Sequence, residues 1–422
     1  MTQDVELLIA GGGLNGLLLG IACAGAGLDC AVVDREDPAR MLSQGFDGRS
    51  SAIAFGSQQV LSALGLWPAI AGEAEPILEI RVADDNSRLY VHYDRRELGT
   101  EAPLGWIVEN RVLRRALFER AGALPSLALL APLAVDMVER LPAAATAVLS
   151  DGQRMTARLV AAADGAASPL RRAAAIRTVE WRYPQTAIVA TVRHERPHAG
   201  IAVEHFLPAG PFAILPMIDD PAPVDDALRA GLPAAPKARS SVVWTEREEL
   251  AARLLALPEP AFAAELAARF GDFLGHVEPA APRWSYPVGL MLAERYVERR
   301  LALVGEAAHV IHPIAGQGLN IGIRDVAALA ELVIDARRLG LDIGEDALLQ
   351  RYQRWRRLDA LLLAAVTDGL NRLFSNSIPP LRLARDLGLA AVDRIAPVKR
   401  FLMRDAMGVT GDLPRLLRGE PL

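Results

Sequence analysis

Residues Val5–Asp34 read VELLIAGGGLNGLLLGIACAGAGLDCAVVD, and this stretch decides the fold of the chain. Its first aliphatic run, Val5–Ala10, is typical of a buried strand and leads directly into a glycine-rich turn. A helical pattern follows over Leu17–Ala26, and a second aliphatic run, Cys30–Val33, ends in an acid. Strand, glycine turn, helix, strand and acid in this order predict the βαβ unit that binds a dinucleotide.

The glycines of the turn have separate expected roles. Gly11 lets the backbone turn tightly, Gly13 lets it approach a pyrophosphate, and Gly16 lets the helix pack against the strand. The free N–H groups and the dipole at the helix start would hold the phosphates. Asp34 stands 23 residues after Gly11, close to the spacing of about 20 expected for an acid that binds a ribose hydroxyl.

A second interpretation of the same stretch is a membrane helix, because Leu7–Leu28 contains no charged residue. Seven glycines and Asn15 within that run argue against a span. Asp4 and Glu6 stand where a signal peptide would carry positive charge. We therefore expect a cytoplasmic protein with neither a targeting segment nor a membrane span.

The composition favours a globular chain of two or three domains. The 422 residues are 51% hydrophobic and 23% charged, and a net charge of −5 gives no reason to expect nucleic acid. The two cysteines, Cys23 and Cys30, form no disulfide framework, and the seven histidines show no metal-ligand spacing. We expect two buried thiols in a reducing compartment and no bound metal.

Two later motifs support the first one. A D-G-x-x-S-x-x-R motif begins at Asp164 and Gly165, directly after an apolar run. A third motif, GEAAHVIHPIAGQGLN, extends from Gly305 to Asn320 and precedes a helical pattern. A carboxylate at a strand end suits a ribityl or ribose hydroxyl, and glycines at a helix start suit the close approach of a flat ring or a phosphate.

At these residues the chain resembles the FAD-dependent aromatic hydroxylases that are similar to p-hydroxybenzoate hydroxylase. Within that group it is most similar to the UbiH/UbiF/VisC type of ubiquinone biosynthesis, and the resemblance covers nearly the whole chain. Its most specific part is HPIAGQGLN at 312–320, followed by Gly322, Arg324 and Asp325. The supporting pieces are Asp47-x-Arg49-Ser50, Glu109-Asn110-Arg111, Tyr183-Pro184-Gln185, Asp368-Gly369-Leu370 and Leu373-Phe374-Ser375.

The resemblance implies an FAD site built from distant parts of the chain. The glycine turn and Asp34 would bind the ADP half, Arg49 would lie beside the flavin or its phosphate chain, and Arg111 would contact the pyrophosphate. Asp164 and Gly165 would serve both FAD and the transient nicotinamide cofactor, NAD(P)H. The ribityl chain and the flavin ring would be held by Glu306 and the Pro313–Asn320 loop, with Gly316, Gln317, Gly318, Leu319 and Asn320 as its cofactor contacts.

Pro313, Gly316 and His312 are the candidates for a place beside the reacting ring. His309 fits a satisfied core histidine better than a catalytic one, and the same alternative stays open for His312.

For three of the implied cofactor residues, the sequence without the resemblance gives weaker evidence of a cofactor contact. Without the resemblance, Arg49 and Arg111 would be interpreted as ordinary surface or structural arginines. Glu306 departs from the Gly-Asp pair that usually opens the third motif, so its carboxylate sits on a longer arm.

The predicted fold class is a Rossmann-like α/β FAD-binding domain, similar to p-hydroxybenzoate hydroxylase, with an inserted α+β substrate domain and a helical C-terminal segment. Alternating patterns predict a β-hairpin over Ile77–Tyr93, and a helical pattern predicts an amphipathic helix over Pro260–Leu274. The expected segments are 1–75, 103–175 and 286–345 for the discontinuous FAD domain, 76–102 and 176–285 for the substrate domain, and 346–422 for the C-terminal helices.

The resemblance further implies a monooxygenase. NAD(P)H would reduce FAD, and the reduced flavin would react with O2 to form a C4a-hydroperoxide that hydroxylates the aromatic ring of a polyprenylated phenol. The sequence holds no second G-x-G-x-x-G unit, which favours a nicotinamide that visits only briefly. Two alternatives stay open: hydroxylation of a soluble aromatic, and a non-catalytic flavin-binding subunit of a biosynthetic complex.

The C-terminal residues bear on the partner. Residues 376–422 carry eight basic and five acidic side chains with interleaved leucines, a pattern that predicts amphipathic helices. Because a polyprenylated substrate must be drawn from the membrane, such a surface suits peripheral binding to anionic lipid at the inner face, or to a partner in a biosynthetic complex. A helical cap on the FAD domain is the equal alternative.

Overall fold

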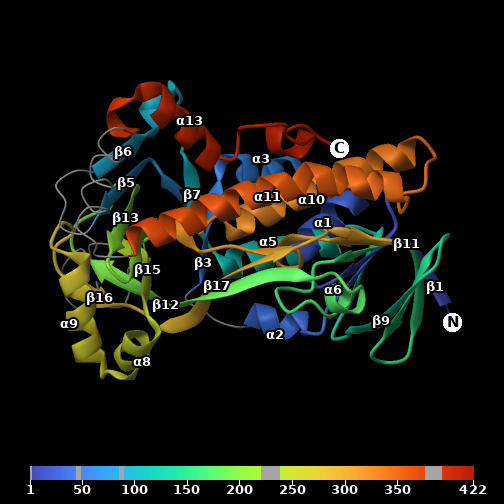
Figure 1. Cartoon of the computed structure of the whole chain (residues 1–422), viewed down its shortest axis with the longest axis horizontal. Helices are drawn as coiled ribbons and strands as arrows, with labels where there is room; N and C mark the ends of the chain where they lie inside the picture. The colour runs from blue at the N-terminus through green and yellow to red at the C-terminus, as the bar shows by residue number, and fades with distance from the viewer. Residues whose placement is uncertain (1, 44–48, 85–89, 220–237, 376–391) are drawn as a thin grey trace, which may run out of the picture.

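The computed structural model describes residues 2–43, 49–84, 90–219, 238–375 and 392–422. Parts of four predictions lie outside these residues: Asp47 of the Asp-x-Arg-Ser motif, the hairpin turn at 85–89, most of the loop that the proline- and acid-rich run Asp219–Arg239 predicts, and the segment 376–391. Figure 1 shows one sheet at the N-terminal end of the molecule and a second sheet at the other end. The long helix α11 (Asp346–Phe374) extends between them, from β18 of the first sheet to β14 of the second.

The first sheet contains the predicted βαβ unit. Its path in the described chain is β18-β19-β11-β1-β2-β8, and β1 pairs in parallel with both β2 and β11. Leu7, Leu8 and Ile9 are fully buried, as expected for a parallel strand covered on both faces. The bounds are β1 Thr2–Ala10, β2 Cys30–Val33, β8 Leu127–Leu130, β9 Val135–Arg140, β10 Ala145–Leu149, β11 Arg154–Ala162, β18 Val297–Glu298 and β19 Leu301–Leu303.

Four helices contact one another in succession beside the first sheet. α1 (Leu14–Gly25) contacts α5 (Asn110–Gly122) and α10 (Gly318–Arg338), and α10 contacts α11.

Cys23 and Cys30 are both buried and unpaired with each other, which confirms the expected structural thiols. Burial raises the pKa of Cys23 to about 12, so this thiol stays protonated and unreactive.

The second sheet is mainly antiparallel, and its path among the described residues is β20-β17-β12-β15-β14-β13-β5-β6, with β16 beside β12. β5 and β6 form the hairpin that the sequence predicts. The bounds are β5 Glu79–Asp84, β6 Tyr90–Asp94, β12 Thr178–His194, β13 Ile201–Leu207, β14 Gly210–Met217, β15 Ala238–Arg247, β16 Val277–Pro279, β17 Trp284–Ala293 and β20 His309–Val310.

The two faces of this sheet have different neighbours. One face packs under α8 (Glu248–Ala256) and α9 (Glu259–Phe270), where Trp244 and Phe212 are fully buried. Side chains of the opposite face join a second core with Met403, on the C-terminal helix α13 (Ala396–Ala406). This opposite face is the one turned toward the third motif, because Phe206 packs there against Ile314.

A small third sheet, β3-β7-β4, lies against β14 of the second sheet. The α/β unit, the second sheet and the C-terminal helices together confirm the predicted fold class. Sheet membership does not follow the expected domain boundaries closely, since β20 and most of β17 come from the 286–345 segment, so these boundaries remain a proposal. The remaining bounds are β3 Ser50–Ala54, β4 Ala74–Ile77, β7 Gly105–Glu109, α2 Pro38–Ser43, α3 Phe55–Ala63, α4 Trp67–Ile70 and α6 Pro169–Ala173.

Candidate cofactor site

The glycine turn has the geometry that a bound pyrophosphate requires. Gly11 has φ +104°, a region that favours glycine, and a Cβ there would strike the carbonyl of Ala163. A Cβ on Gly16 would strike the carbonyl of Gly11, so this glycine permits the close packing of α1 on the turn. A Cβ on Gly13 would meet nothing within 4 Å, so this position opens onto free space.

The start of α1 has the features of an anion-binding site, and no side chain of the protein caps it. Gly13 is the N-cap residue, it supplies no side-chain cap, and the first turn holds no acidic residue. The N–H groups of a helix start lack intrahelical partners, so they are available to a phosphate. Asp34 lies beside the turn, where it accepts hydrogen bonds from the N–H groups of Gly12 and Glu36. A carboxylate has acceptor capacity beyond two hydrogen bonds, so Asp34 can still receive a ribose hydroxyl.

The second motif lies directly against this turn, because β11 is the parallel neighbour of β1. Asp164 accepts a hydrogen bond from the N–H of Leu170 at 3.2 Å through Oδ2. Its Oδ1 is buried and has no partner among the described residues, and burial raises the pKa of this carboxyl. A buried acceptor left open is expected where a ligand hydroxyl completes the hydrogen bonding. Gly165, with φ +83°, provides the turn that follows.

Arg171 of the same motif is structural and joins the second motif to the third. Its guanidinium is buried and donates to the carbonyl oxygens of Ala307 and Ala166, each at 2.8 Å. Ser168 caps the short helix α6 by accepting the N–H of Arg171 at 3.0 Å. Ser168 and Arg171 therefore hold loops in place, while Asp164 keeps an unpartnered oxygen for a ligand.

The third motif closes on the first through Asn15, a residue of α1 that the sequence did not single out for binding. A Cβ on Gly305 or on Gly322 would strike the side chain of Asn15, so both glycines are needed for this contact. The Asn15 Oδ1 atom is buried and has no partner in the described chain. Glu306, next to Gly305, is exposed, which leaves its carboxylate available to a ligand.

A buried ion network fixes the base of the third motif. Asp325 is fully buried, and its carboxylate lies 2.6 Å from Nε2 of His309 and accepts a hydrogen bond from Nε of Arg356 at 2.8 Å. It also accepts the N–H of Gly305 at 3.1 Å. Burial acts to raise the pKa of Asp325, but the charges of His309 and Arg356 outweigh it and hold the pKa below its usual value. His309 is thus a satisfied core histidine, in agreement with the expectation.

The Pro313–Asn320 loop is held to β3 by Asn320. The Asn320 amide donates to the carbonyl of Ala52 at 2.9 Å, and its oxygen accepts the N–H of Ala54 at 2.9 Å. The side chain is therefore committed to the protein, and a cofactor contact at Asn320 falls to its backbone. Gly316 has φ +62° and lies against Ala52, whereas Gly318 is exposed at the uncapped start of α10.

The two predicted arginines come together because β3 and β7 are antiparallel neighbours. Arg49 precedes β3 and is exposed, and its carbonyl accepts the N–H of Asn110 at 2.9 Å. Arg111 follows β7 and forms an ion pair with the buried Glu109, which also pairs with Arg239 at 3.1 Å. Both arginines therefore flank one end of the third sheet.

His312 is fully buried, and burial lowers its pKa to about 4. Its Nδ1 accepts the N–H of Ile314 at 3.3 Å, and its ring lies edge-on to Tyr183 at 5.2 Å between centroids. The Tyr183 hydroxyl donates to Asp368 at 2.6 Å. Gln185 and Asn371 are joined at 3.1 Å in the same region, so two of the supporting motifs form a hydrogen-bonded bridge between β12 and α11. Tyr183 of this bridge packs against the ring of His312.

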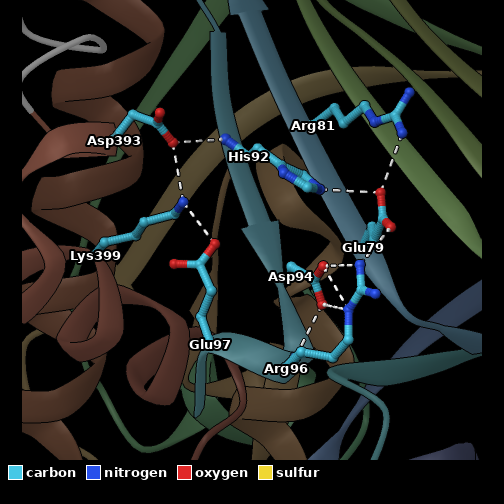
Figure 2. A network of polar contacts seen from close by, with 8 residues as sticks. All are labelled: Glu79, Arg81, His92, Asp94, Arg96, Glu97, Asp393 and Lys399. Atoms are coloured by element: carbon cyan, nitrogen blue, oxygen red, sulfur yellow. Dashed lines mark hydrogen bonds and ion pairs between the residues drawn. The ribbon is translucent and has the colours of Figure 1, made fainter. Parts of the chain in front are cut away.

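A separate polar cluster on β5 and β6 has no open ligand position (Figure 2). Glu79 lies 3.0 Å from Nε2 of His92 and 3.1 Å from Arg81, and Asp94 pairs with Arg96, so side chains of the protein already contact both carboxylates. Nearby, Lys399 donates to Glu97 at 2.8 Å and to Asp393 at 3.0 Å. Because Lys399 is buried, this cluster clamps α13 to the edge of the second sheet.

Comparisons with known proteins agree with this geometry. The family described as FAD binding domain matches residues 4–364. Ubiquinone hydroxylase UbiL of Rhodospirillum rubrum is 52% identical over 99% of this chain and 93% of its own length. The 3-demethoxyubiquinol 3-hydroxylase of Escherichia coli is 34% identical over 96% of this chain and 99% of its own length. Ubiquinone biosynthesis monooxygenase COQ6 of Homo sapiens is 30% identical over 94% of this chain and 91% of its own length.

Solved structures show the same fold at lower identity. The p-nitrophenol 4-monooxygenase PnpA of Pseudomonas putida has a TM-score of 0.76 at 20% identity, over 97% of this chain and 99% of that chain. PqsL of Pseudomonas aeruginosa has a TM-score of 0.72 at 21% identity, over 92% of this chain and 99% of that chain.

The open N-terminus of α1, the free space at Gly13 and the unpartnered Asp164 Oδ1 fit FAD. The chain therefore belongs to the FAD binding domain family, and within it to the FAD-dependent hydroxylases of ubiquinone biosynthesis.

Proposed function

We propose that this hydroxylase acts on the aromatic ring of a polyprenylated phenol, with NAD(P)H as reductant and O2 as co-substrate. The observation that carries the proposal is the match over almost the whole chain to relatives whose names state ubiquinone hydroxylation. When bound, reduced FAD supplies the activated oxygen. The protein supplies a site that binds the ring, orients it and keeps water away.

The apolar contact between the third motif and the second sheet supports an aromatic substrate. Ile314, in the loop that would hold the flavin ring, packs with Phe206 of β13 and Phe374 of α11. The two phenylalanine rings stack at 4.2 Å between centroids. A flat apolar ring is compatible with these neighbours. His312, two residues before Ile314, is neutral near pH 7 because its pKa is about 4.

Peripheral membrane association is the second part of the proposal. Among the described helices, none is long and apolar enough to cross a membrane. Helix α13 buries Met403, and Met407, which follows the helix, is also buried. The helix exposes Val398 and Phe401, with Phe401 60% accessible. Arg394, Arg400 and Arg404 are also exposed there. Apolar side chains flanked by arginines suit an anionic lipid surface, from which a polyprenylated substrate would enter.

A quinone-deficient bacterial host expressing this chain tests the function. Recovery of quinone, identified by mass spectrometry, is the expected result. Purified protein then separates the alternatives: a soluble aromatic hydroxylase would consume NAD(P)H with simple phenols and not with prenylated ones. A non-catalytic flavin-binding subunit would carry FAD and show no substrate-dependent NAD(P)H oxidation at all.

A further inference from the structure

The face of the second sheet that is turned toward the third motif carries Glu204 of β13, and the buried Asp84 of the neighbouring strand β5 lies on the same face, opposite Phe206. Successive side chains of a strand point to opposite faces, so Glu204 shares its face with Ala202 and Phe206. Phe206 contacts Ile314, and Ala202 packs in the core that contains Met403. The neighbouring Val203 packs on the other side, under α8 and α9.

The residues directly opposite Glu204 are apolar. Its cross-strand partners on the same face are Val82 of β5 and Ala213 of β14. Within the described residues no side chain or backbone group donates a hydrogen bond to it, and it takes part in no ion pair. The side chain is only partly buried, so a small molecule can reach it. Burial by the apolar neighbours raises the pKa of this carboxyl to about 7.

Apolar neighbours remove part of the hydration of this carboxylate, and a ligand that donates a hydrogen bond to it would compensate for that loss. An ionised carboxylate only accepts hydrogen bonds, so its ligand must donate one. A phenolic hydroxyl is such a donor, and the apolar side chains around Glu204 suit the ring that carries it. A second carboxylate or a phosphate is excluded, because like charges would repel.

We propose that Glu204 accepts a hydrogen bond from the ring hydroxyl of the substrate and so fixes the ring between β13 and the Pro313–Asn320 loop. This inference rests on the proposed function, since it assigns the residue that recognises the hydroxyl of that substrate. The hydroxyl sets which edge of the ring faces the flavin loop, so Glu204 determines the orientation of the ring.

Binding of two matched compounds to the FAD-loaded full chain tests the assignment: a singly prenylated phenol and its methyl ether, which cannot donate. At pH 8 the wild type should bind the phenol about tenfold more tightly than the ether, as a charge-assisted hydrogen bond provides. The preference should shrink at pH 6, where the carboxyl is protonated.

The variants separate the hydrogen bond from folding. Glu204→Leu should bind both compounds equally, whereas Glu204→Gln should keep part of the preference and lose its pH dependence. Glu249→Gln, an exposed change on α8, should behave as the wild type does. Flavin content and near-UV circular dichroism establish that each variant is folded.

Two outcomes would overturn the assignment, and they differ. A wild type that hydroxylates the phenol while Glu204→Leu keeps the full preference would overturn the role of Glu204 alone. A wild type that neither binds nor hydroxylates the prenylated phenol would overturn the proposed function and this inference with it.

Discussion

Arg171 donates a hydrogen bond from Nη1 to the carbonyl oxygen of Ala307 at 2.8 Å, across 136 residues of sequence. This buried contact fixes the position of the third motif relative to Asp164, and both must contact the same cofactor. The FAD site is therefore an arrangement of loops held by buried polar contacts behind it, and its integrity depends on residues that never touch the flavin.

Replacing Arg171 with alanine should weaken FAD binding without altering any cofactor contact. The change leaves the buried carbonyl of Ala307 unpaired, at a cost of about 1–3 kcal/mol, and removes the hydrogen bond to the carbonyl of the exposed Ala166. Flavin titration and thermal denaturation measure the two effects. Arg172→Ala, at the exposed neighbouring position, is the matched control. Full FAD affinity in Arg171→Ala would show that the second and third motifs are positioned independently.

Gly13→Leu should give a folded, colourless protein. The position has a φ of −67° and open space around it, so the backbone accepts a side chain, but that side chain would occupy the place of the pyrophosphate. Gly16→Ala should instead destabilise the fold, because its Cβ would strike the carbonyl of Gly11. Gly25→Ala, at the open end of α1, serves as control. A yellow Gly13→Leu protein with normal flavin content would refute this placement.

His312 should make the protein less stable in acid. Its folded-state pKa of about 4 lies below the ordinary 6.5, so the unfolded chain binds the proton more tightly. Stability should be unaffected above pH 6.5 and fall as the pH drops toward 4, by up to about 3 kcal/mol. Urea denaturation of the wild type and His312→Phe over this range measures the difference in slope. The exposed His276→Gln should keep the wild-type slope, and equal slopes for all three proteins would contradict the burial of a neutral His312.

Anionic vesicles should bind the wild type through α13. Changing Phe401 and Leu402 together to serine removes two exposed apolar side chains and should lower vesicle binding about tenfold. Leu339→Ser removes a side chain that is 74% exposed on another part of the surface and should change nothing. Co-sedimentation with phosphatidylglycerol-containing vesicles at low and high salt is the measurement. Unchanged binding by the double variant would remove the basis for the lipid surface.

The sequence predicts the three motifs well because each depends on local chain geometry. A tight turn and a helix start have recognisable spacing, as Gly11, Gly13 and Gly16 show. The long-range contacts are different. Nothing in the local pattern indicates that Asn15 fills the space between Gly305 and Gly322, or that Arg171 reaches Ala307, because tertiary packing alone brings these residues together.

The second sheet shows the same limit at the level of strands. The apolar run Ile188–Arg193 predicts a short strand, but β12 extends over Thr178–His194. Its first half is largely exposed and polar, so periodicity does not reveal it, whereas pairing with β17 and β15 stabilises it. The sequence pattern does not reveal Glu204 for a related reason: a single acid in a strand pattern is normally interpreted as solvent-facing.

In the proposed reaction, this chain uses FAD to insert one atom of O2 into the ring of a prenylated phenol. Its most direct test is mass spectrometry of the product formed by purified, FAD-loaded protein with NAD(P)H under isotopically labelled O2. We predict a product with one added hydroxyl whose oxygen carries the label. A product with unlabelled oxygen, or NAD(P)H oxidation that yields only hydrogen peroxide and leaves the phenol unchanged, would contradict the claim.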